Sequence, residues 1–288
     1  MTAVLPKAIG ALSEISGGYD VILCDVWGVL HNGIGAFPDA ASALERVRRA
    51  GAVVVLITNA PRPAREIEAG LATLGVPRAA WDRLVTSGDV TRDLIADGPR
   101  RIFHLGPDRD LVLFDGLDVE RVEEFEAATV VCTGLFDDET ETPEDYGGML
   151  QRLRARDLPF ICANPDIVVE RGERLIWCAG ALARDYAQLG GRTLIAGKPR
   201  RAIYEAALAA AADAAGKPIS AARTLAIGDG ILTDIKGAEA SGIDAVFVTA
   251  GIHAAEYAGS GGAADASRLA AFLDRHGLQP VATMPRLR

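Results

Sequence analysis

The stretch VILCDVWGVLHNG, residues 21–33, decides the fold that we expect for this chain. The apolar run from Val21 to Cys24 is typical of a strand that is buried on both faces of a parallel sheet. Asp25 follows this run directly and opens a loop that contains glycine and asparagine. Because ligands of doubly wound sheets bind beyond the carboxyl ends of the strands, the stretch predicts a functional carboxylate at residue 25.

The rest of the chain alternates short apolar runs with amphipathic stretches, which is the pattern of βα units around a parallel sheet. Strands of the main sheet are predicted at residues 20–25, 52–59, 193–197, 223–229 and 244–251. Helices are predicted at 39–51, 61–75, 200–216, 232–242 and 266–277. In the middle of the chain, further strand-like runs are at 101–106, 128–134 and 159–166, with a helix at 142–157.

We therefore expect an α/β protein with a Rossmann-like, doubly wound parallel-sheet core and an inserted α/β cap domain. The core is predicted to be discontinuous, with residues 1–77 and 186–288, and the cap to comprise residues 78–185. The C-terminal segment 280–288 is expected to be frayed.

Composition and charge restrict the class of protein. The net charge of −9 argues against a nucleic-acid partner, which would require a basic patch. No apolar run of about 18 residues predicts a transmembrane helix, and neither a polybasic tract nor a signal peptide is recognisable, so we expect no membrane partner. We expect a cytoplasmic protein whose four scattered cysteines are buried thiols.

Polar side chains terminate four of the predicted core strands. They are found in Asp25, Thr58-Asn59, Gly197-Lys198-Pro199 and Gly228-Asp229. One carboxylate can act as a nucleophile and a second can help to hold Mg²⁺, while the hydroxyl, amide and ammonium groups can position phosphoryl oxygens. Any one of these residues alone is ordinary loop chemistry, but the four together in this order indicate a phosphoryl-transfer site.

The same residues, extended to the sequence GDGILTD at 228–234, resemble the motifs of the haloacid dehalogenase superfamily of aspartate-nucleophile hydrolases. The insert, with its Asn164-Pro165-Asp166, resembles the class IIA branch more narrowly. That branch includes sugar-phosphate, pyridoxal-phosphate and 4-nitrophenyl-phosphate phosphatases. The resemblance covers nearly the whole chain.

The resemblance implies a role for each matching residue. Asp25 would be the nucleophile that forms an aspartyl-phosphate. The phosphoryl group or the substrate would be bound by Thr58, Asn59, Ala60, Lys198 and Asp166. A Mg²⁺ ion would be held by Asp25, Asp229, Asp234 and the backbone carbonyl of Trp27. The implied substrate is a small phosphorylated metabolite, and cap-mediated dimerisation, which is common in the branch, makes a homodimer a further expectation.

Trp27 departs from the family pattern. The phosphatases carry a second aspartate two residues after the nucleophile, which protonates the leaving oxygen and later activates water. An indole can do neither, because its nitrogen is a donor without a useful pKa. Loss of general acid–base catalysis typically costs about 10²–10⁴-fold in rate, whereas the backbone carbonyl that faces the metal is retained.

Three interpretations of this departure follow. The first is a phosphatase with reduced general acid–base capacity, which acts on substrates with good leaving groups or uses His31 as a substitute acid. The plainer explanation of His31 is an ordinary loop histidine. The second is a dehalogenase-like hydrolase, since halide departure needs no proton, although the acidic metal motif argues against it. The third is a non-catalytic sensor of a phosphorylated metabolite, against which the retained Asp25, Lys198, Asp229 and Asp234 argue.

Overall fold

The structure is a computed structural model that describes residues 5–259 and 262–288. The chain divides into two compact units. The first unit is formed by Met1–Ile57, Glu68–Val85 and Tyr204–Arg288, and the second by Thr58–Ile67 and Thr86–Ile203.

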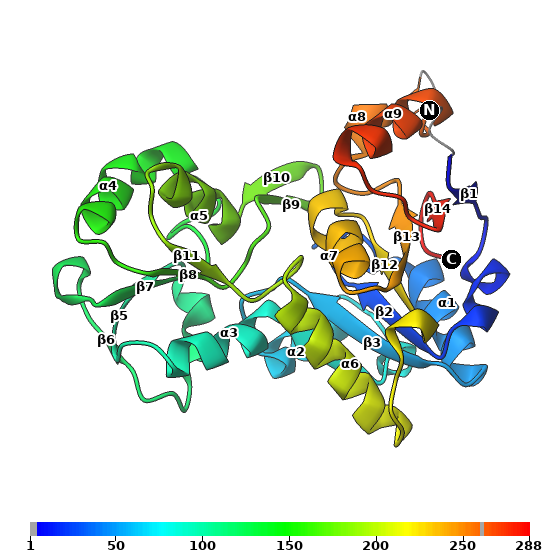
Figure 1. Ribbon diagram of the computed structural model, residues 1–288, viewed down its shortest axis with the longest axis horizontal. Coiled ribbons are helices and arrows are strands. Elements are labelled where there is room, and N and C mark those ends of the chain that lie inside the picture. The colour runs from blue at the N-terminus through cyan, green and yellow to red at the C-terminus, as the bar shows by residue number, and fades with distance from the viewer. Residues whose placement is uncertain (1–4, 260–261) are drawn as a thin grey trace. The chain divides into compact units, whose positions relative to one another are not determined.

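A seven-stranded sheet forms the centre of the first unit, in the order β1-β14-β13-β12-β2-β3-β4 (Figure 1). Its strands are β1 (Lys7–Ala8), β14 (Ala282–Met284), β13 (Asp244–Val248), β12 (Thr224–Gly228), β2 (Val21–Asp25), β3 (Val53–Thr58) and β4 (Arg83–Thr86). Neighbouring strands from β1 to β3 pair in parallel. The last residues of β3 and β4, Thr58 and Thr86, are counted with the second unit.

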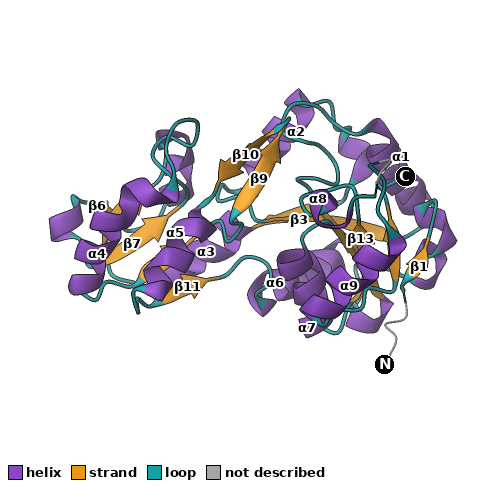
Figure 2. Cartoon of the chain, turned by 90° about the horizontal axis from the view of Figure 1, so that it is seen from above, coloured by secondary structure: helices purple, strands orange, loops and turns teal. Residues whose placement is uncertain are grey.

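The central strand β2 is buried along its whole length, as its apolar sequence predicts. The helices associated with this unit are α1 (Pro38–Arg49), α2 (Ala64–Thr73), α6 (Arg201–Ala215), α7 (Lys236–Ala240), α8 (Ala254–Tyr257) and α9 (Ala266–His276). Figure 2 shows α6, α7 and α9 on one side of the sheet and α1 on the other. The predicted doubly wound α/β class is therefore confirmed.

The second unit contains a five-stranded sheet in the order β11-β8-β7-β5-β6, and all its pairs are parallel. Its strands are β11 (Thr193–Ile195), β8 (Phe160–Cys162), β7 (Thr129–Cys132), β5 (Arg101–Leu105) and β6 (Glu120–Arg121). Its helices are α3 (Ser87–Ala96), α4 (Gly147–Ala155) and α5 (Ala179–Gln188). Separately, β9 (Val168–Arg171) and β10 (Arg174–Trp177) form an antiparallel hairpin.

Both faces of this second sheet are buried. On one face Val130, Cys132 and Phe160 contact a cluster that includes Leu150 of α4 and Tyr186 of α5. The alternating residues of the same strands contribute to a second cluster, together with Ile95 of α3 and with Leu113 and Phe114 of the 3-10 helix Asp108–Phe114. The second unit is thus an α/β sandwich with its own core.

Two expectations from the sequence were wrong. The strand predicted at residues 193–197 was placed in the main sheet, but β11 pairs with β8 in the second unit. The C-terminal segment was expected to fray, but β14 lies between β1 and β13 and its three residues are buried. Both errors concern the pairing partner of a short strand. Such a partner lies far away in the sequence, so a local pattern does not reveal it.

All four cysteines are free and buried, as predicted. Within residues 5–259 and 262–288, no helix combines the length and the apolar character that a membrane crossing requires.

His104 of β5 is largely enclosed within the second unit. Its Nε2 lies 2.9 Å from the Thr133 hydroxyl, and its ring meets Phe114 edge to face with the centroids 5.2 Å apart. Burial disfavours the charged imidazolium and lowers the pKa of His104 from 6.5 to about 4. His104 therefore stays neutral in the folded protein under conditions in which the unfolded chain takes up a proton.

We predict that His104→Gln reduces the dependence of stability on pH. The pKa of His104 is lower in the folded than in the unfolded protein, so below about pH 6.5 the unfolded chain takes up a proton that the folded protein does not. The folded state is therefore most favoured above about pH 6.5, and this contribution to stability is lost as the pH falls toward 4. Between about pH 7 and pH 4.5, the wild-type protein should lose about 2 kcal/mol more free energy of unfolding than the variant. Guanidinium unfolding of both proteins at the two pH values measures this difference. Equal losses would contradict the prediction.

Candidate active site and metal centre

Asp25 is the last residue of β2, and its side chain is only 5% exposed. The strand holds this position firmly, because β2 pairs on one side with β3 and on the other with β12. The apolar residues before Asp25 are buried, so the chain has its first polar side chain where the strand ends. This is the placement that the sequence predicts for a functional carboxylate.

Asp229 and Asp234 follow the neighbouring strand, β12. Asp229 is the residue after its end at Gly228, and Asp234 lies in the π-helical turn Ile231–Ile235 that precedes α7. Such turns are rare in proteins, and those that occur are often found at functional sites. The backbone N–H of Gly230 donates to Asp234 Oδ2 at 3.0 Å, and that of Ile252 donates to Asp229 Oδ2 at 3.0 Å. Each carboxylate is therefore oriented by a backbone amide.

The three carboxylates form one buried cluster. Each residue offers an oxygen, and these oxygens lie within 4.8 Å of one another. The side chains are 5%, 7% and 4% exposed for Asp25, Asp229 and Asp234. Like charges this close and this buried repel strongly, and a divalent cation relieves the repulsion. An oxygen-only donor set fits Mg²⁺, which is usually held by one or two carboxylates together with water or substrate oxygens.

Two glycines allow the backbone to approach Asp229 closely. A Cβ on Gly28 or on Gly251 would lie 2.1 Å from Asp229 Oδ2. Gly28 also has a φ of +83°, which disfavours other residues. Sequence reasoning missed these two positions, although each glycine lies three residues beyond the end of a strand.

Trp27 and His31 lie in the loop that follows β2. Their rings meet edge to face with centroids 4.9 Å apart, and the N–H of Gly28 donates to the carbonyl of His31 at 2.8 Å. Trp27 is half-buried, whereas His31 is 4% exposed. The N–H of Gly33 donates to His31 Nδ1 at 2.9 Å. Burial lowers the pKa of His31 from 6.5 to about 4, so the neutral ring predominates at neutral pH.

The predicted residues of the second unit form a hydrogen-bonded group. Asn59 donates from Nδ2 to Asp166 Oδ1 at 2.8 Å, and the N–H of Lys198 donates to Asn59 Oδ1 at 2.8 Å. Thr58, Asn59 and Lys198 are each at most 5% exposed. The N–H of Ala60 donates to the Thr58 hydroxyl at 3.3 Å. The structure thus joins Asn59, Asp166 and Lys198 through direct hydrogen bonds.

Other charged residues that follow Asn164-Pro165-Asp166 form ion pairs within the second unit. Arg171 of β9 pairs with Asp138 and Glu139, and Arg174 of β10 also pairs with Glu139. These contacts explain the two arginines as partners of nearby carboxylates.

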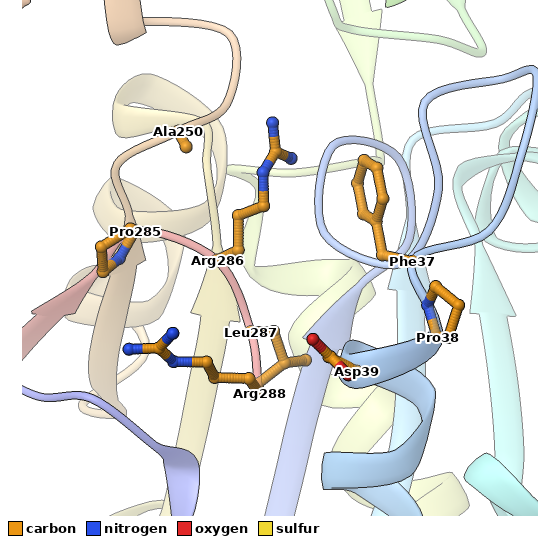
Figure 3. A pocket seen from close by; sticks show the side chains of 8 residues that line it. All are labelled: Phe37, Pro38, Asp39, Ala250, Pro285, Arg286, Leu287 and Arg288. Carbon is orange, nitrogen blue, oxygen red and sulfur yellow. The ribbon is translucent and has the colours of Figure 1, made fainter. Parts of the chain in front are cut away.

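A cavity of about 380 Å³ lies in the first unit, beside the C-terminal segment (Figure 3). It is lined by Phe37, Pro38, Asp39, Ala250, Pro285, Arg286, Leu287 and Arg288. The guanidinium of Arg286 stands over the Phe37 ring, 4.8 Å from its centroid. None of the three clustered carboxylates lines this cavity, so it is distinct from the candidate metal centre.

Comparisons with known proteins identify the class of this molecule. A family model described as haloacid dehalogenase-like hydrolase matches residues 22–120, and one described as HAD-hydrolase-like matches residues 195–271. A crystal structure of a hydrolase of the haloacid dehalogenase-like family from Brucella suis is 57% identical, covers 99% of this chain and 100% of its own, and has a TM-score of 0.88.

Two more distant relatives are also similar over most of the chain. Human chronophin is 27% identical over 281 residues, which cover 86% of this chain and 87% of chronophin. Glycerol phosphate phosphatase from Mycobacterium tuberculosis, solved in complex with calcium, is 28% identical with a TM-score of 0.63. It covers 85% of this chain and 70% of its own. The chain belongs to the haloacid dehalogenase-like hydrolase family, which confirms the resemblance that its motifs predicted.

We predict that Gly251→Ala weakens Mg²⁺ binding by about 10- to 100-fold, because the added methyl group displaces the Asp229 carboxylate. Gly70→Ala is the matched control, since a Cβ there meets no atom within 4 Å. Calorimetric titration with MgCl₂ measures both affinities against the wild type. Wild-type affinity in Gly251→Ala would show that the position of the Asp229 carboxylate does not matter for the metal.

Proposed function

We propose that this hydrolase is a Mg²⁺-dependent phosphatase of a small phosphorylated metabolite and that it works through an aspartyl-phosphate. The observation that carries the proposal is the buried cluster of Asp25, Asp229 and Asp234 at the ends of β2 and β12. A hydrolase that buries three carboxylates together gains from a cation there, and a cation at such a site suits an anionic, phosphorylated substrate.

In this proposal Asp25, Asp229, Asp234 and the backbone carbonyl of Trp27 hold the Mg²⁺ ion. The bound ion would offset the negative charge of the phosphoryl group and of the carboxylates around it. The amides of Gly230 and Ile252 keep two of the carboxylates oriented for this task.

Asp25 is proposed as the nucleophile. Its carboxylate oxygen bonds to phosphorus while the bond from phosphorus to the leaving oxygen breaks and the leaving group keeps the electron pair. Water then attacks the phosphorus of the aspartyl-phosphate, which releases inorganic phosphate and restores the carboxylate. Thr58, Ala60 and Lys198 are proposed to bind the phosphoryl oxygens through the hydroxyl, the backbone and the ammonium group.

Trp27 determines which leaving groups this chemistry accepts. The indole cannot protonate a departing alkoxide, so we propose that the enzyme favours leaving groups that are stable as anions, such as carboxylates and phenolates. The role of His31 as a substitute acid stays a prediction. Its low pKa and the N–H that Gly33 donates to Nδ1 both argue against it. The same lack of an acid makes a phosphometabolite sensor the second candidate.

We predict that wild-type kcat/KM falls about 10²–10⁴-fold from acetyl phosphate and 4-nitrophenyl phosphate to an alkyl phosphate, because only the alkoxide needs a proton. Trp27→Asp should raise the rate on the alkyl phosphate and flatten this dependence. Asp25→Asn and removal of Mg²⁺ by EDTA should abolish turnover of all three compounds. Steady-state and single-turnover phosphate release provide the measurements.

The same assays separate the alternatives. A wild-type protein inactive on all three substrates, with activity appearing only in Trp27→Asp, would overturn the phosphatase proposal in favour of a sensor. Halide release from a haloacid without Mg²⁺ would instead support a dehalogenase.

A further inference from the structure

We infer that Asn59 and Asp166 are a positioning pair that fixes the backbone of Lys198, and that the side-chain amide of Asn59 is not a ligand of the phosphoryl group. The inference rests on the proposed function in one respect, because that function assigns the ammonium group of Lys198 to the phosphoryl oxygens. The positioning itself is a property of the second unit and can be tested without any activity.

Both ends of the Asn59 carboxamide are committed. Oδ1 accepts the N–H of Lys198 at 2.8 Å, whereas Nδ2 donates to Asp166 Oδ1 at 2.8 Å and, over a longer 3.4 Å, to the carbonyl of Lys198. The orientation of the amide is unambiguous, because a backbone N–H can only donate and an ionised carboxylate can only accept. Asn59 therefore bridges the main chain of Lys198 and the side chain of Asp166.

The donor count argues against a direct contact of the Asn59 side-chain amide with a phosphoryl group. An amide nitrogen carries two hydrogens, and phosphoryl oxygens are acceptors that need one of them. Both hydrogens already face acceptors, and Asn59 is only 2% exposed. Releasing one of them would leave the carboxylate of Asp166 or the carbonyl of Lys198 without this donor.

Two glycines allow the backbone to pack closely against Asn59 and Asp166. A Cβ on Gly197, the residue before Lys198, would lie 2.8 Å from Asn59 Oδ1 and 2.4 Å from Ser87 Oγ. A Cβ on Gly180 would lie 2.4 Å from the carbonyl oxygen of Asp166, which accepts the N–H of Gly180 at 3.1 Å. These close approaches leave Asn59 and Asp166 little room to move.

Lys198 gains from this arrangement because its own side chain is 2% exposed. A buried ammonium on a flexible stem acts at one place only if its backbone is held still. The Asn59 amide contacts both the N–H and the carbonyl of Lys198, as the backbone of a neighbouring strand would. The charge on Asp166 strengthens the bond that orients the amide.

The test exchanges the two side chains. Asn59→Asp sets two carboxylates against each other and removes the donor, so kcat on acetyl phosphate should fall about 10- to 100-fold. Asp166→Asn keeps an acceptor for Nδ2 but loses the charge, so kcat should fall less than in Asn59→Asp. The double variant Asn59→Asp/Asp166→Asn restores the bond in the reverse direction, so it should recover most of the loss. Asp118→Asn, at an exposed position of the same unit, is the control.

A second readout is independent of turnover. The chain has only four lysines, and Lys7, Lys217 and Lys236 are exposed references for the buried Lys198. Acetic anhydride labelling followed by mass spectrometry should show faster modification of Lys198 in Asn59→Asp and in Asp166→Ala. Labelling of the other three lysines should not change, and in the double variant Lys198 should regain its protection.

Each outcome decides the inference. Recovery in the double variant supports the pair, also where Asn59→Asp alone does not fold. A double variant as impaired as Asn59→Asp, together with unchanged Lys198 labelling in Asp166→Ala, would overturn it. If the wild type has no phosphatase activity but the labelling follows the predicted order, the proposed function fails while the positioning pair stands.

Discussion

The repulsion between three buried carboxylates is the constraint on which the first unit depends. Taking a single carboxylate out of water costs several kcal/mol, and bringing a second and a third within a few ångströms adds to that cost. Nevertheless, two adjacent central strands end so that Asp25 and Asp229 follow buried residues, and the π-helical turn adds Asp234. Backbone amides orient two of the groups, and two glycines make room for one of them. A counter-charge lowers this cost, which is why we propose a divalent cation at the cluster.

At residue 27 two functions are distinguished: metal binding through the backbone carbonyl and proton transfer through the side chain. The backbone carbonyl at this position is independent of the side chain, so tryptophan in place of aspartate keeps the carbonyl that we propose as a metal ligand. Proton delivery is different, because it needs a side chain with a suitable pKa. His31 contacts the indole but is buried, and its Nδ1 accepts the N–H of Gly33. The residues of the loop consequently contact one another, while neither the indole nor the buried imidazole is suited to deliver a proton.

The sequence was most informative where a property is local. Continuous apolar runs predicted β2, β3 and β12, and the polar residues that end these runs predicted the candidate site. The sheet to which β11 belongs, and the incorporation of β14 into the main sheet, depend on strand partners far away in the chain. The roles of Gly28 and Gly251 depend on how closely Asp229 approaches them, which no motif records. His31 looked like a free titratable group because burial cannot be seen in a short polar stretch.

Asn59 shows why a motif match does not by itself define a role. The sequence places an amide next to Thr58 and suggests a phosphate ligand, since an amide can donate. The structure places Asp166, more than a hundred residues away, at one end of that amide and the backbone of Lys198 at the other. Once both hydrogens have acceptors, the remaining capacity of the group is to accept, and an anionic phosphoryl oxygen has nothing to donate. In our proposal Asn59 therefore contributes to catalysis through Lys198, whose backbone N–H and carbonyl both contact the Asn59 amide.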